Sequence, residues 1–82
     1  MRIPQRDLLP LDQIETFEAW ATGHGYIVEP ARRDGVVLRL RSATASAPIL
    51  FRMRAVRQDH VTTAGRGLTL VRDFLREMKA RG

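Results

Sequence analysis

The stretch VVLRLRSATASAPILFRMRA, residues 36–55, contains two segments in which apolar and polar side chains alternate. Such alternation is typical of a β-strand with one buried and one exposed face. Small residues and a proline at 42–48 separate the two segments and are typical of a turn. Residues 36–41 and 49–55 are therefore predicted to be strands that share one apolar face.

Shorter strands are predicted on both sides of this pair. Residues 26–29, YIVE, read as a strand, and Asp34-Gly35 is a hairpin turn signal that joins it to the next one. A brief further strand is predicted at 61–63, VTT. Strands joined by hairpins pair antiparallel, so we expect an antiparallel sheet of three to four strands.

Two helices flank the strands in the sequence. Asp12 and Glu15 have the spacing of a capping box, and apolar residues follow at helical spacing, which predicts a helix over residues 12–22. Apolar spacing predicts a second helix from Leu68 to about Ala80. The fold class is thus α+β in the order α-β-β-β-α, with both helices on one face of the sheet. Residues 1–11 are predicted to be an extended arm, and residues 12–82 a single domain.

Composition excludes several classes of protein. The 82 residues include no cysteine, so disulfides and cysteine-ligated metal sites cannot form. No apolar run approaches the roughly 20 residues of a membrane span, and the N-terminus has no signal-peptide pattern. A cytoplasmic protein without a membrane partner is the expectation. The two histidines have no metal-ligand spacing, and no catalytic residue, cofactor or metal site is predicted.

Positive charge is concentrated in the middle of the chain. Residues 32–66 carry a net charge of +6, whereas residues 1–31 carry −3. If the two central strands are adjacent, their polar face brings Arg39, Arg41, Arg52 and Arg54 close together. Like charges that face each other across a sheet are destabilising, so these arginines need compensation. Glu29 or Asp59 can supply it, as can an external polyanion or screening by water and salt.

A second candidate anion site is the segment 60–67, HVTTAGRG, which leads into the second helix. Helix N-termini attract anions, and Arg66 adds a positive charge. The segment lacks the spacing of a phosphate-binding loop, and a glycine-bearing junction with a threonine cap is the favoured interpretation. His60 with Asp59 or Thr62 has the composition of a general-base pair, although a histidine in a turn is more common.

The order α-β-β-β-α over residues 12–80 resembles the double-stranded RNA-binding domain and the small RNA-cleaving toxins of HicA type. The resemblance is confined to the order of the elements. The lysine cluster and the Gly-Pro-x-His loop of the RNA-binding domain are missing, as is the Gly-Ser-His stretch of the toxins. No functional residue is therefore transferred from either family.

These observations predict a small, basic, non-enzymatic module that binds nucleic acid or another polyanion with little base specificity. The alternative is an accessory protein of a phage or mobile element that binds an acidic surface of a host protein and regulates or inhibits it, as a monomer or as a homodimer. The predicted binding residues are all arginines: Arg32, Arg33, Arg39, Arg41, Arg52, Arg54, Arg57 and Arg66.

Overall fold

The computed structural model describes residues 7–29, 35–42, 47–53 and 59–81. The elements in chain order are β1 (Leu9–Pro10), the 3-10 helix η2 (Leu11–Gln13), α1 (Ile14–Gly23), β2 (Tyr26–Glu29), β3 (Val36–Ser42), β4 (Ile49–Met53), β5 (His60–Thr62) and α2 (Arg66–Arg81). The predicted α+β class is confirmed. The prediction of three to four strands is wrong, because the described residues form five, and the element order differs accordingly.

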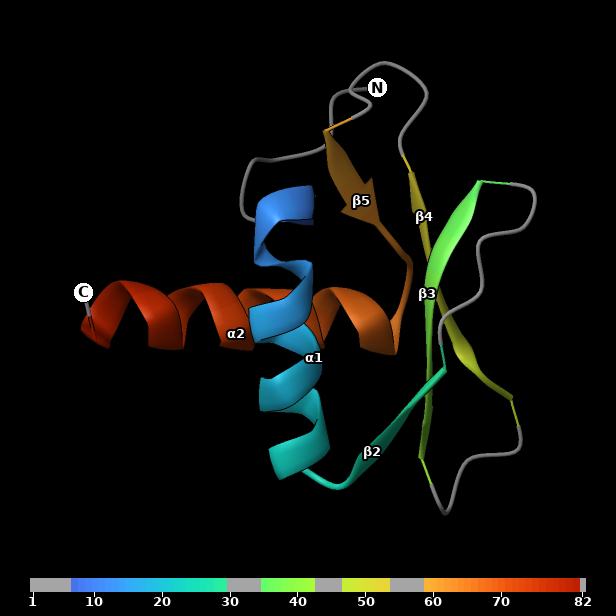
Figure 1. Cartoon of the computed structure of the whole chain (residues 1–82), viewed down its shortest axis with the longest axis horizontal. Coiled ribbons are helices and arrows are strands. Elements are labelled where there is room, and N and C mark those ends of the chain that lie inside the picture. Colours follow the sequence, from blue (N-terminus) through green and yellow to red (C-terminus); the bar gives the residue numbers. More distant parts are fainter. Residues whose placement is uncertain (1–6, 30–34, 43–46, 54–58, 82) are drawn as a thin grey trace.

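The strands form one antiparallel sheet in the order β1-β5-β4-β3-β2. The predicted neighbours β2 and β3 pair with each other, as do β3 and β4. The sheet curls into a half-barrel, and both helices lie on its inner side, where α1 crosses α2 (Figure 1). No described element covers the outer side, so the side chains that point outward from the sheet face solvent (Figure 1).

Three phenylalanines from three different elements form the centre of the core. Phe17 of α1 meets the rings of Phe51 on β4 and Phe74 on α2 edge-on, each at a centroid distance of 5.2 Å. All three side chains are fully buried, as are Leu38 and Leu40 on β3. The alternating apolar positions of the central strands therefore do face the helices, as their spacing predicts.

The strand that the sequence did not predict is β1, which lies within the segment 1–11 predicted to be an extended arm. It pairs with β5 at the margin of the sheet, with Leu9 opposite Val61. Leu8 and Leu9 are both buried, so this segment contributes to the core. A strand of two residues is too short to produce an alternating pattern, which is why the sequence did not indicate it.

The first helix begins differently from the prediction. Asp12 lies inside η2, and α1 starts at Ile14. Neither η2 nor α1 has a side-chain hydrogen bond at its N-cap, so the predicted capping box of Asp12 and Glu15 does not form. The end of the helix agrees with the sequence: Gly25 follows it with a φ of 89°, a conformation that glycine adopts at little cost.

The start of α2 packs tightly against its surroundings. Gly67 is buried in the first turn, where a Cβ would collide with the side chain of Thr63 and lie 2.8 Å from Cγ2 of Ile49. A glycine is therefore needed here for close packing. This observation favours the structural interpretation of the 60–67 segment, in which its glycines serve the junction between β5 and α2.

Candidate nucleic-acid interface

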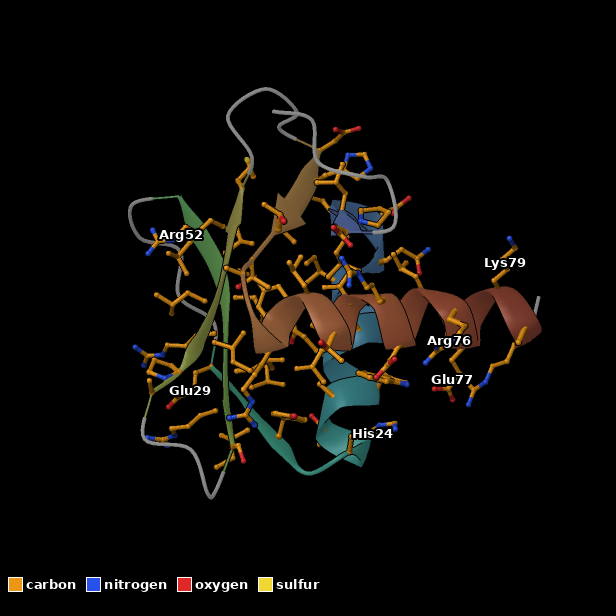
Figure 2. The ribbon with its side chains drawn as sticks, turned by 180° about the vertical axis from the view of Figure 1, so that it is seen from behind. His24, Glu29, Arg52, Arg76, Glu77 and Lys79 are labelled. Atoms are coloured by element: carbon orange, nitrogen blue, oxygen red, sulfur yellow. The ribbon has the colours of Figure 1, made fainter. Side chains whose placement is uncertain are left out.

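Three of the predicted arginines lie on the outer face of the sheet. Arg39 and Arg41 alternate with buried residues on β3, and Arg52 is adjacent to the buried Phe51 on β4. Figure 2 shows Arg52 and Glu29 on the side of the sheet that faces away from both helices. The strand pairing therefore brings these charges onto one open surface, which we call the outer arginine face: Arg39, Arg41 and Arg52.

The register of the strands keeps these arginines from lying directly opposite one another. Arg39 is paired with Leu50, and Arg52 is paired with Val36. The register shifts by one residue between Val36 and Leu38, as it does at a β-bulge, and this shift lies beyond the pair of Arg39 and Leu50. The expected juxtaposition of arginines across adjacent strands is therefore relieved, because an aliphatic side chain occupies the position facing Arg39.

Glu29 supplies the internal compensation that the sequence suggested. It lies on β2 directly opposite Arg39. Its Oε1 accepts a hydrogen bond from Nε of Arg39 at 3.2 Å, and its Oε2 lies 3.5 Å from Nη2 of Arg41. One carboxylate thus bridges two guanidinium groups, and the three groups remain partly exposed to solvent.

Arg52 has a different environment. Among residues 7–29, 35–42, 47–53 and 59–81 it makes no ion pair, and it is exposed. Its cross-strand neighbour on β5 is Thr62, an uncharged residue. The outer arginine face therefore combines a partly neutralised pair of arginines with a third whose charge no described carboxylate offsets.

The other predicted binding residues do not join this group within the described structure. Arg66 is exposed, but it is the first residue of α2 and belongs to the helical layer. Four more fall outside the described residues: Arg32, Arg33, Arg54 and Arg57.

His60, the histidine considered as a general base, is nearly buried and contacts its neighbour Asp59. The side chain of His60 is only 9% exposed, and its Nδ1 lies 2.8 Å from Oδ1 of Asp59. The hydroxyl of Thr62 donates to the backbone carbonyl of Asp7 at 3.2 Å. Within the described residues, the hydroxyl of Thr62 is thus hydrogen-bonded to Asp7 and not to His60. Nor do those residues contain a group of three or more histidine and acidic side chains that could hold a metal ion.

Two polar arrangements were not predicted. Arg72 on α2 donates two hydrogen bonds to the buried Asp7, from Nε at 2.6 Å and from Nη2 at 3.1 Å. This bidentate contact raises the pKa of Arg72 above its ordinary value, chiefly through the hydrogen bond and then through the charge of Asp7. The two residues are 65 positions apart, so no local spacing could reveal the pair.

The second arrangement joins the ends of the two helices. The indole Nε1 of Trp20 donates to Oε2 of Glu77 at 2.6 Å, and Arg81 donates to Oε1 of the same carboxylate at 3.0 Å. The ring of His24 lies over Trp20 with a centroid distance of 4.2 Å. The separation of four residues between Trp20 and His24 was a signal that their side chains share one helix face. This cluster ties α1 to α2.

Comparison of the chain with protein-family models, with curated proteins and with solved structures finds no match. Neither described helix is long and apolar enough to span a membrane.

Proposed function

We propose that the protein is a non-enzymatic module that binds the phosphate backbone of nucleic acid through the outer arginine face. The observation that carries this proposal is the placement of Arg39, Arg41 and Arg52 on one side of a sheet whose opposite side packs against both helices. Their backbone positions are fixed by strand pairing, so presenting them requires no rearrangement of the fold. Guanidinium groups match phosphate well, because they donate parallel hydrogen bonds and keep their charge at all physiological pH values.

The chemistry of the face favours contacts with the backbone over contacts with bases. None of the outward side chains described on β2, β3 and β4 is aromatic; the apolar ones between the arginines include Ile27 and Leu50. Proteins that read single strands stack bases on aromatic rings, which this face does not offer. We therefore expect binding with little base specificity and a strong dependence on salt.

The test is a fluorescence-anisotropy titration with labelled single- and double-stranded DNA and RNA. The variant Arg39→Gln/Arg52→Gln removes two charges from the outer face without placing a new carboxylate beside Glu29. Its control, Arg76→Gln/Arg81→Gln, removes two charges from exposed positions on α2. We expect the first variant to lose most of its affinity and the control to retain more. The two variants have the same net charge, so a difference between them reports the position of the removed arginines.

Equal losses in both variants would show that only net charge matters and would refute the site. Absence of binding by the unaltered protein at low salt would refute the proposal as a whole. In that event the regulatory protein-binding function would take its place. That alternative is favoured by Ile27, a large apolar side chain 47% exposed beside the arginines, which suits a protein surface better than a phosphate backbone.

A further inference from the structure

The two edges of the sheet differ in how they are protected against pairing with another strand. The β1 edge has only two residues, and one of them is Pro10, which has no N–H group to donate. Short edge strands and prolines are common protections against edge-to-edge association. The β2 edge has four residues, Tyr26–Glu29, none of them a proline or a lysine. It therefore lacks the protections found at the opposite edge.

The backbone groups on the free edge of β2 have no partner strand among the described residues. Among the strands of the described residues, β2 is the last in the sheet and pairs with β3 alone (Figure 1). No backbone hydrogen bond from β2 to any other described element is found. On this strand lies Ile27, the large apolar residue that is most exposed in the described structure. An edge with open hydrogen-bonding groups and an exposed β-branched side chain is a template for another strand.

We infer that β2 pairs antiparallel with β2 of a second copy of this chain, around a two-fold axis that passes through Ile27. A symmetric antiparallel pair requires an axis perpendicular to the sheet, and directly opposed side chains then point to the same face. Side chains alternate between the two faces along a strand, so residues on one face differ by an even number of positions. Each residue of one copy must therefore face either its own counterpart or a residue an even number of positions away. Because Ile27 is opposite its own copy in this register, two exposed apolar side chains cover each other.

The neighbouring registers are less favourable. An axis through Val28 would place Ile27 opposite Glu29, so a carboxylate and not an apolar side chain would cover Ile27. An axis through Tyr26 would extend it into His24, where α1 ends. The register centred on Ile27 instead places Glu29 opposite Gly25, so no like charges meet across the junction. Glu29 also remains available to Arg39 and Arg41 within its own chain.

This pairing would join two five-stranded sheets into one continuous sheet. The perpendicular axis keeps the helices of both copies on one side and both outer arginine faces on the other. The inference does not depend on nucleic-acid binding, since it rests on the edge and on Ile27 alone. A dimer is therefore expected whether or not a polyanion binds.

The register can be tested by cross-linking. The chain contains no cysteine, so Ile27→Cys introduces a single thiol, and Thr69→Cys on the exposed face of α2 is its control. Directly opposed residues of antiparallel strands have Cα atoms about 4.5 to 5.5 Å apart. This distance falls within the range of about 4.4 to 6.8 Å that a disulfide spans. Mild oxidation should convert Ile27→Cys to a covalent dimer several times faster than Thr69→Cys, and equal rates would overturn the register.

A second measurement tests the edge itself without relying on oxidation. Light scattering coupled to size exclusion should give twice the 9.3 kDa chain mass for the unaltered protein at high concentration. Ile27→Lys, a common protection of edge strands, should raise the dimer dissociation constant at least about tenfold, equivalent to about 1.4 kcal/mol. Circular dichroism checks that the variant is folded. A monomer at all concentrations up to about 1 mM, or a dimer that Ile27→Lys leaves intact, would overturn the inference.

Discussion

Replacing Glu29 with glutamine should make the protein bind nucleic acid more tightly. The change preserves the size of the side chain and removes the carboxylate that bridges Arg39 and Arg41. In the unaltered protein a phosphate must compete with this carboxylate for both guanidinium groups. Without the carboxylate, the two arginines become available to phosphate at no cost in broken ion pairs.

The size of the effect follows from counterion release. Each additional phosphate contact steepens the dependence of log K on log salt by about 0.9 on duplex DNA. Between about 50 and 200 mM salt, one further contact therefore changes the loss of affinity by about 3.5-fold, and two change it by about 12-fold. The cost to folding should be small, because ion pairs between partly exposed groups contribute up to about 1 kcal/mol.

The assay is the anisotropy titration at several salt concentrations, with Glu15→Gln as the control. Glu15 is an exposed residue in the first turn of α1, so its replacement produces the same change in net charge away from the sheet. Glu29→Gln should show a steeper salt dependence and a higher affinity at low salt than Glu15→Gln. If the two variants have the same affinity and the same salt dependence, removing the competing carboxylate does not help phosphate to reach Arg39 and Arg41, and the assignment of the outer arginine face is refuted.

Three further outcomes concern the fold. Gly67→Ala should destabilise the protein by about 1 to 3 kcal/mol in chemical denaturation, because its Cβ has no space, whereas Gly23→Ala should cost little, since nothing lies within 4 Å of a Cβ there. Asp7→Asn should lower the melting temperature more than Asp73→Asn, because Asp7 is buried and bound at two points by Arg72, while the other carboxylate makes one exposed contact. The pKa of Arg72 is raised, so its charge stabilises the fold at every pH below its unfolded-state pKa. Thermal melts between pH 6 and 9 should therefore show no loss of stability attributable to Arg72.

The parts of the fold with a clear period could be predicted from the sequence. Strict alternation at 36–41 identified both the buried residues Leu38 and Leu40 and the outward Arg39 and Arg41. The apolar spacing of the second helix likewise identified a helix close to the observed one. In both cases a long segment packs with one face against the core, and this requirement imposes a period on the sequence.

The rest depended on contacts between distant parts of the chain. The pairing of β1 with β5 and the contact of Asp7 with Arg72 each join the N-terminal segment to the last third of the chain. Asp12 is a residue type that often caps a helix. In the structure it lies inside η2, which follows Pro10, and α1 begins two residues later at Ile14. Local sequence patterns carry no information about such tertiary contacts. Where the two disagree, the tertiary structure prevails over local propensity.

The outer arginine face shows how strand register can decide the chemistry of a surface. Alternation alone predicted a set of arginines repelling one another across two strands. The register of β3 and β4 instead pairs Arg39 with Leu50, and β2, on the other side of β3, places Glu29 opposite Arg39. Arg39 therefore lies between an aliphatic residue and a carboxylate, while Arg52 lies beside Thr62. Glu29 thus offsets part of the charge of this surface, and the proposed function expects a phosphate backbone to bind the guanidinium groups that remain exposed.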